Sequence, residues 1–119
     1  MTKVLVVDDS AFMRMAIKNI LADKDYEIFE AEDGALAVEK FIECAPDIIT
    51  MDITMPQYNG IDALKQIRTI DGNAKVVMIS AMGQEMMVKQ ALVHGATAFI
   101  VKPFKHEQVL QTLAKVAST

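Results

Sequence analysis

The sequence has no tryptophan, a single cysteine, three prolines and five isolated glycines among its 119 residues. One cysteine excludes an internal disulfide, and the apolar neighbours of Cys44 indicate a small buried side chain, with a reactive thiol as the alternative. We find no repeat, no low-complexity tract, no linker and no glycine-rich phosphate loop. These absences, with 52% hydrophobic residues, predict one globular domain over residues 1–119.

Long apolar runs are also missing. The run at residues 4–7 is too short for the core of a signal peptide, and no other run reaches membrane-spanning length, so we expect a cytoplasmic protein without membrane contact. Positive charge is scarce, since 12 Lys and Arg stand against 16 Asp and Glu, for a net charge of -4. This balance argues against direct binding of nucleic acid and favours a protein partner or a small anion.

Short apolar segments alternate with amphipathic ones along the whole chain. The expected strands are residues 3–7, 26–31, 48–52, 75–80 and 98–101. The expected helices are a first one from about Ser10, then residues 34–44, 61–70 and 83–94, and a last one carrying an apolar stripe over residues 109–117. Short connections between strands and helices imply a parallel sheet with helices on both faces. The pattern predicts a doubly wound, flavodoxin-like (βα)5 fold of the α/β class, with strand order 2-1-3-4-5.

Polar side chains gather where the expected strands end. Asp8 and Asp9 follow the first strand, and Asp52 ends the third. Ser80 ends the fourth strand, and Lys102 follows the fifth. In a sheet of this order, ligands bind at the carboxyl ends of the first and third strands, where the winding direction switches. The sequence therefore predicts three carboxylates, a hydroxyl and an ammonium group at one edge of the sheet.

Each of these residues also has a plain structural explanation. Asp52 alone is compatible with capping the following turn, and Asp8 and Asp9 with acidic residues favoured at a helix start. Ser80 is compatible with tying down a turn, and Lys102 with a strand-end lysine that extends along apolar surface. Their joint placement at one edge favours a functional site over these separate explanations.

Three neighbouring carboxylates repel one another unless a cation binds or a pKa rises. Mg²⁺, which prefers octahedral oxygen ligands, suits Asp9 and Asp52 as direct ligands and Asp8 through a water molecule. One carboxylate can then attack phosphorus, because the metal and Lys102 offset charge on the phosphoryl oxygens. We assign this nucleophile to Asp52, and the Ser80 hydroxyl can donate to a bound phosphoryl oxygen.

Several motifs resemble a known family over the whole chain. They are Val7-Asp8-Asp9-Ser10, Met51-Asp52-Ile53-Thr54-Met55-Pro56 with Gly60, Ile79-Ser80-Ala81, and Val101-Lys102-Pro103-Phe104. This set is similar to the response-regulator receiver domain of two-component signalling. More narrowly, the segments at residues 11–15 and 80–84, together with the Asp52 segment, resemble the stand-alone, CheY-like chemotaxis response regulators.

The resemblance implies that Asp52 accepts a phosphoryl group from the phosphohistidine of a CheA-like histidine kinase. It implies Mg²⁺, with Mn²⁺ as an alternative ion, bound by Asp9, Asp52 and the main-chain carbonyl of Thr54, with Asp8 nearby. It also implies a cis peptide at Lys102-Pro103. Such a protein is not an enzyme in the usual sense, since it catalyses only its own phosphorylation and dephosphorylation, and its target in chemotaxis is the flagellar motor switch.

The resemblance further implies a switch, in which Ser80 moves toward the phosphoryl group and Phe99 swings inward behind it. This movement remodels a face formed by the fourth helix, the fifth strand and the fifth helix, on which we expect Val88, Phe99 and Val101 to contact the target. The switch aromatic is Phe99 where many relatives have tyrosine, so it has no hydroxyl group to bond in either state.

Two further departures concern the lifetime of the phosphoryl group. Thr54 and Met82 stand where relatives often carry amide or acidic groups that tune hydrolysis. Our hypothesis is that Met82 hinders the attacking water.

Other functions compete with this interpretation. A Mg²⁺-dependent aspartyl phosphatase on a similar sheet needs an Asp-x-Asp spacing, which Asp8-Asp9 does not provide. A flavodoxin-like carrier would place its phosphate loop where these acids would repel the ligand. Within the receiver class, a phosphorelay intermediate and a receiver excised from a larger regulator remain open, although the end at Thr119 favours a stand-alone messenger.

Overall fold

The computed structural model describes residues 1–55 and 59–119, so the predicted loop residue Pro56 lies outside the described residues. The strands are β1 (Thr2–Val7), β2 (Tyr26–Ala31), β3 (Ile48–Asp52), β4 (Val76–Ser80) and β5 (Ala98–Val101). The helices are α1 (Ala11–Leu21), α2 (Gly34–Cys44), α3 (Gly60–Ile70), α4 (Glu85–Val93) and α5 (His106–Ala117). The predicted alternation of strands and helices is confirmed.

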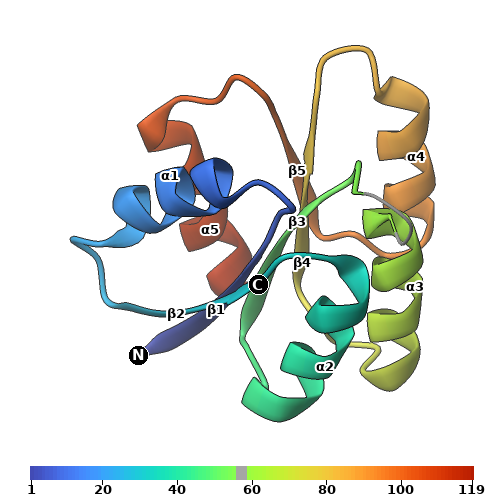
Figure 1. Ribbon diagram of the computed structural model, residues 1–119, viewed down its shortest axis with the longest axis horizontal. Coiled ribbons are helices and arrows are strands. Elements are labelled where there is room, and N and C mark those ends of the chain that lie inside the picture. Colours follow the sequence, from blue (N-terminus) through green and yellow to red (C-terminus); the bar gives the residue numbers. More distant parts are fainter. Residues whose placement is uncertain (56–58) are drawn as a thin grey trace.

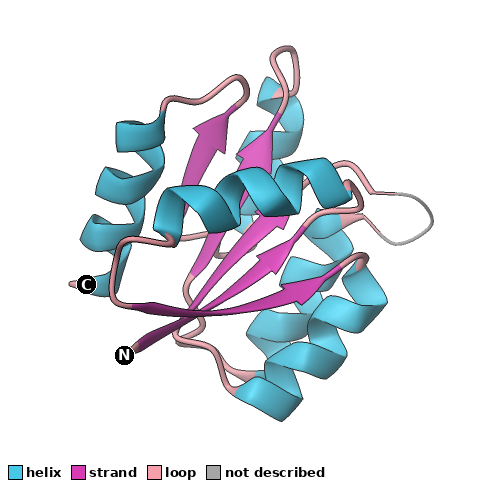
Figure 2. Ribbon diagram, turned by 60° about the vertical axis from the view of Figure 1, so that its left-hand side comes forward, coloured by secondary structure: helices cyan, strands magenta, loops and turns pink. Residues whose placement is uncertain are grey.

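The strands form one parallel sheet in the order β2-β1-β3-β4-β5, which confirms the predicted topology. Helices α1 and α5 cover one face of the sheet, and α2, α3 and α4 cover the other (Figure 1). Figure 2 shows the strands lying side by side with their arrowheads toward one edge. The carboxyl ends of the strands therefore meet at that edge.

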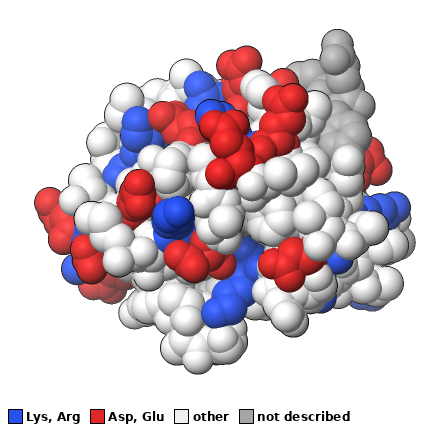
Figure 3. Space-filling view, turned by 90° about the horizontal axis from the view of Figure 1, so that it is seen from below, with Lys and Arg blue, Asp and Glu red and all other residues white. Residues whose placement is uncertain are grey.

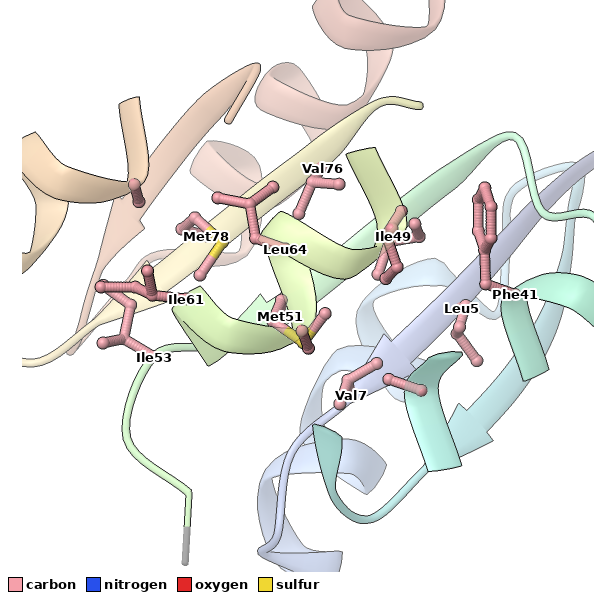
Figure 4. Packing of buried hydrophobic residues seen from close by; sticks show 14 of the residues in the cluster. Leu5, Val7, Phe41, Ile49, Met51, Ile53, Ile61, Leu64, Val76 and Met78 are labelled. Atoms are coloured by element: carbon pink, nitrogen blue, oxygen red, sulfur yellow. The ribbon is translucent and has the colours of Figure 1, made fainter. Parts of the chain in front are cut away.

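The central strands are apolar without interruption because both of their faces are buried. In β1, Val4 and Val6 contribute to the core under α1 and α5, whereas Leu5 and Val7 contribute to the core under α2, α3 and α4. Side chains alternate between faces along a strand, so successive residues enter different cores. Figure 4 shows the second core, in which Leu64 of α3 packs above the sheet.

Side-chain oxygen atoms cap the N-termini of α1, α2 and α3. The predicted N-cap Ser10 is confirmed, since its hydroxyl accepts a hydrogen bond from the Met13 N–H at 3.2 Å. Asp33 caps α2 in the same way, and Asn59 caps α3. Such caps satisfy backbone N–H groups that have no partner within the helix.

The start of the fourth helix differs from the prediction. We expected a helix over residues 83–94, but α4 begins at Glu85 and ends at Val93. Gly83 has a φ angle of +89°, which is incompatible with the right-handed helix, and Gln84 occupies the cap position without a capping side-chain hydrogen bond. Gly95, with φ at +100°, terminates the helix as predicted.

Cys44 was expected to be buried and is only partly so. It is the last residue of α2, directly before Ala45, which turns the chain in the left-handed conformation. The helix end faces outward here, so the apolar neighbours of Cys44 in sequence do not enclose it.

No helix in residues 1–55 and 59–119 is both long and apolar enough to cross a membrane. Figure 3 shows Lys and Arg dispersed among Asp and Glu over the face drawn there. The chain as a whole carries a net charge of -4.

Gly60 is required by a close approach of two backbone segments. A Cβ atom at this position would lie 2.2 Å from the carbonyl oxygen of Asp52 and 3.0 Å from the Cα atom of Ile53. The Gly60 N–H donates to the Ile53 carbonyl at 2.8 Å, which holds α3 against the end of β3. Any other residue must therefore displace backbone next to Asp52.

We expect Gly60→Ala to lower the free energy of unfolding by about 1–3 kcal/mol, as overpacking of a tight contact does. Gly72→Ala is the matched control, because a Cβ atom there meets nothing within 4 Å, and it should be neutral or slightly stabilising. Urea unfolding of both variants measures the difference. Equal stability of the two variants would contradict the assigned role of Gly60.

Candidate functional site

The register of the sheet brings three acidic residues together. Val7 of β1 lies opposite Met51 of β3, so the next residue along each chain segment, Asp8 and Asp52, emerges beside the other. One carboxylate oxygen from each of Asp8, Asp9 and Asp52 lies within 4.8 Å of one from each of the others. The predicted convergence of these three side chains is confirmed.

The three carboxylates differ in their surroundings. Asp8 is 1% exposed and Asp52 is 6% exposed, whereas Asp9 is exposed to solvent. The Asp8 Oδ1 atom accepts a hydrogen bond from the Ser10 N–H at 2.9 Å, which fixes this side chain at the start of α1. Its Oδ2 atom is buried and has no hydrogen-bond partner among the described residues. An oxygen in this condition is available to a cation.

Lys102 provides the nearest positive charge. Its Nζ atom lies 3.5 Å from Asp8 Oδ2 and 3.6 Å from Asp52 Oδ1. One ammonium group therefore faces two buried carboxylates, and the charge of the site remains negative. The Lys102-Pro103 peptide bond is cis, which confirms the conformation that the family resemblance implied.

Burial raises the pKa of the Asp52 carboxyl group to about 6, and the negative charge of Asp8 adds to this rise. The positive charge of Lys102 lowers the pKa of Asp52, and the negative charge of Asp9 raises it. The ionised form of Asp52 is thus disfavoured in the protein alone. A bound cation would relieve this penalty.

The donor set fits a hard divalent ion. Carboxylate oxygens on two strand ends, one of them lacking a hydrogen bond, are the ligands that Mg²⁺ selects. Asp9 is exposed beside them, which leaves room for the water molecules that Mg²⁺ retains. The participation of the Thr54 carbonyl stays a prediction, as do the separate roles of Asp8, Asp9 and Asp52 toward the ion.

Ser80 ends β4 beside this cluster. It is 1% exposed, and its hydroxyl oxygen has no hydrogen-bond partner within the described part of the chain. A buried hydroxyl without a partner is costly unless a ligand completes it. Ser80 is thus a free donor at the edge where the carboxylates meet.

The residues predicted for the output face do not all lie on the surface. Phe99 is 46% exposed and Val101 is partly buried, which agrees with a surface at β5. Val88, in contrast, is 8% exposed and packs into the core under α4, so its predicted contact with a target is wrong. The exposed apolar residues of α4 are Met86, Leu92 and Val93.

Two residues at the site were not predicted from the sequence. The Arg14 guanidinium donates to the Asp8 carbonyl at 2.7 Å and to the Glu30 carboxylate at 3.0 Å, so it links the loop after β1 to β2. Hydrogen bonds from Lys18 and Arg14 hold the pKa of Glu30 below its usual value. The second unpredicted residue is Gln84, whose carboxamide contacts both Ala81 and Thr54.

Arg14 lies four residues, or one helical turn, after the N-cap Ser10, so its side chain lies above the start of α1. Asp8 precedes Ser10 by two residues, so a local sequence signal for the contact between Arg14 and Asp8 was present. No comparable local pattern points to Gln84, because its partner Thr54 is 30 residues away in sequence.

The geometry agrees with comparisons to known proteins. Residues 4–114 match the family model of the response regulator receiver domain. The chain is 55% identical to the chemotaxis protein CheY of Thermotoga maritima, with 97% of each chain covered, and 54% identical to that of Bacillus subtilis, with 95% of each covered. The crystal structure of the receiver domain of NtrX from Brucella abortus superposes with a TM-score of 0.93 at 30% identity, covering 98% of each chain. The chain therefore belongs to the response regulator receiver domain family.

Proposed function

We propose that this chain is a chemotaxis response regulator that accepts a phosphoryl group on Asp52 and passes the signal on by changing its surface. The observation that carries this proposal is the buried Asp52 carboxylate, which faces Lys102 at 3.6 Å and shares one edge of the sheet with two further carboxylates and the partnerless Ser80 hydroxyl. The high identity to proteins named chemotaxis protein CheY supports the pathway.

The donor is the phosphohistidine of a CheA-like histidine kinase. An oxygen of the Asp52 carboxylate attacks phosphorus, and the P–N bond breaks with its electron pair going to the imidazole nitrogen, which takes up a proton. The product is an acyl phosphate on Asp52 and a neutral histidine on the kinase. Hydrolysis later returns the carboxylate and inorganic phosphate.

The surrounding residues stabilise the charge of the transferred group. Lys102 lies close enough to contact a phosphoryl oxygen on Asp52, and the Ser80 hydroxyl donates to another. Asp8, Asp9, Asp52 and the Thr54 carbonyl would hold Mg²⁺, or Mn²⁺ in its place. When bound, the ion neutralises negative charge on the carboxylates and on the phosphoryl oxygens.

The target binds a face composed of α4, β5 and α5, on which Phe99 is partly exposed. In chemotaxis this target is the flagellar motor switch, and no direct contact with nucleic acid or membrane is proposed. A phosphorelay intermediate or a receiver within a larger regulator would use the same phosphorylation chemistry with another partner. An aspartyl phosphatase is the alternative from a different class.

Incubation with Mg²⁺ and acetyl phosphate should add one phosphoryl group to the intact protein. Asp52→Asn should abolish this addition, because the amide is not a nucleophile for phosphorus. Asp62→Asn is the matched control, since Asp62 is an exposed carboxylate on α3, and it should be labelled like the wild type. Mass spectrometry of the intact proteins gives the result.

Labelling of Asp52→Asn to the extent of the wild type would remove Asp52 as the acceptor. Multiple turnover of simple phosphate monoesters, such as p-nitrophenyl phosphate, would favour the phosphatase instead. A signalling receiver should show at most one phosphoryl group per chain and no such turnover.

The raised pKa of Asp52 makes both stability and Mg²⁺ affinity depend on pH. Because the pKa of Asp52 is about 6 in the folded protein and 3.8 in the unfolded chain, the stabilisation from a protonated Asp52 is present below about pH 4 and lost as the pH rises through about 6. We therefore expect Asp52→Asn to be more stable than the wild type at neutral pH without Mg²⁺, by on the order of 2 kcal/mol.

In the wild type, Mg²⁺ competes with the proton on Asp52, so its affinity should fall by nearly tenfold for each pH unit below about 6. Urea unfolding at several pH values and calorimetric titration with Mg²⁺ measure the two effects. Stability and Mg²⁺ affinity that stay constant between about pH 5 and pH 7 would contradict the raised pKa.

Met82 follows Ser80 by two residues and is 77% exposed, so its apolar side chain lies on the surface of the loop beside the site. We expect Met82→Asn to shorten the lifetime of the acyl phosphate by about threefold to tenfold, because an amide can orient the attacking water through a hydrogen bond. Met86→Asn is the control, since Met86 is similarly exposed, at 72%, but lies on α4. The decay of labelled protein after removal of acetyl phosphate gives the rates. A lifetime unchanged in Met82→Asn would refute the hypothesis that Met82 hinders water.

A further inference from the structure

A side chain on the loop before α4 connects the two loops that flank the phosphorylation site. The Gln84 Oε1 atom accepts a hydrogen bond from the Ala81 N–H at 2.6 Å, and the Gln84 Nε2 atom donates to the Thr54 hydroxyl oxygen at 2.5 Å. We call this pair of hydrogen bonds the Gln84 bridge. It joins the loop after β4, which follows Ser80, to the loop after β3, which follows Asp52.

The local backbone brings Gln84 into this position. Gly83 has a φ angle of +89°, so the chain turns back after Met82, and the Gln84 carboxamide reaches the N–H group three residues earlier. Gln84 occupies the cap position of α4 but does not cap the helix with its side chain. Its carboxamide is committed to the bridge instead.

The bridge restrains the segment that has to move. Ala81 is covalently next to Ser80, so a shift of the Ser80 hydroxyl toward a phosphoryl group on Asp52 carries the Ala81 N–H with it. The Ser80 carbonyl accepts a hydrogen bond from the Lys102 N–H at 2.7 Å, so the β5 side already restrains Ser80. On the loop side, the hydrogen bond from the Ala81 N–H to Gln84 supplies the restraint. The Gln84 bridge holds that side in place relative to Thr54.

The bridge occurs together with an outward Phe99 side chain. Phe99 is 46% exposed, which is the arrangement expected before the ring swings inward, and the Lys102 Nζ atom lies 3.5 Å from Asp8 Oδ2 and 3.6 Å from Asp52 Oδ1. An interaction made in only one of two states stabilises that state and opposes the transition to the other. A shift of Ser80 and Ala81 toward a phosphoryl group would displace the Ala81 N–H from the Gln84 carboxamide and so strain or break the bridge.

We propose that Gln84 is a positioning residue that sets the balance between the unphosphorylated and phosphorylated arrangements, by holding the loop after Ser80 to Thr54. This inference rests on the proposed function, because it assumes that Asp52 is the acceptor. Loss of the bridge then lowers the cost of reaching the phosphorylated arrangement and raises the affinity for a phosphoryl analogue.

The test uses beryllofluoride, which adds to a carboxylate as a phosphoryl analogue, in the presence of Mg²⁺. Gln84→Ala should bind it about threefold to tenfold more tightly than the wild type, which is the expected size for the loss of one or two hydrogen bonds present in one state only. Gln90→Ala is the matched control, because Gln90 is an exposed glutamine on α4, and it should bind like the wild type. Thr54→Val removes one of the two bonds and should give a smaller increase than Gln84→Ala.

Two further measurements separate positioning from a general loss of stability. The Ala81 amide proton should exchange faster with solvent in Gln84→Ala but not in Gln90→Ala, while the free energy of unfolding of both stays near that of the wild type. Combining Thr54→Val with Gln84→Ala should add little to Gln84→Ala alone, because both act on one bridge.

Beryllofluoride affinity in Gln84→Ala that equals or falls below the wild-type value would overturn the proposal. Failure of the wild type itself to bind beryllofluoride with Mg²⁺ would overturn the assignment of Asp52, which is a different result. The Ala81 exchange measurement does not depend on which residue is the acceptor, so unchanged exchange in Gln84→Ala would exclude the bridge even then. Failure of the bridge and failure of the Asp52 assignment are therefore distinguishable.

Discussion

Repulsion among carboxylates at the edge of a parallel sheet is the constraint on which the site depends. Asp8 and Asp52 are buried, and one Lys102 ammonium group, 3.5 Å and 3.6 Å from them, does not neutralise both together with Asp9. The pKa of Asp52 is raised to about 6, chiefly by burial and also by the negative charges of Asp8 and Asp9. The protein therefore retains an unfavourable charge arrangement that binding of a cation relieves, which is the usual mark of a functional site.

The fold maintains this arrangement through backbone contacts close to the acids. Gly60 lets the start of α3 approach the Asp52 carbonyl, and Arg14 holds the Asp8 carbonyl from the side of α1. Both contacts act on main-chain atoms, so they fix where the strand ends lie without using the carboxylates themselves. The carboxylate oxygens stay available for ligands.

Much of this organisation could be predicted from the sequence, because strand order and strand ends determine which residues meet at the edge of a parallel sheet. The rotation of α4 could not, since Met86, Met87 and Val88 are consecutive apolar residues and periodicity alone does not show which one faces inward. The start of α4 was misplaced because Gly83 turns the chain with a φ angle of +89°, and the Gln84 carboxamide bonds to Ala81 and to Thr54, 30 residues away, instead of capping the helix. A contact of that kind depends on the tertiary structure and leaves no local pattern.

The sheet also connects the site to the surface at β5. Ser80 lies opposite Val101 in the register of β4 and β5, Met78 lies opposite Phe99, and the Lys102 N–H donates to the Ser80 carbonyl. The end of β4 cannot move without changing its hydrogen bonds to the strand that carries both Lys102 and Phe99. The hydrogen bonds between β4 and β5 thus connect the end of β4 to the strand that carries the half-exposed Phe99 ring, and the coupled movement of Ser80 and Phe99 stays a prediction. Because packed interfaces change between discrete arrangements, this connection is the route by which the proposed phosphorylation of Asp52 would alter the surface at β5.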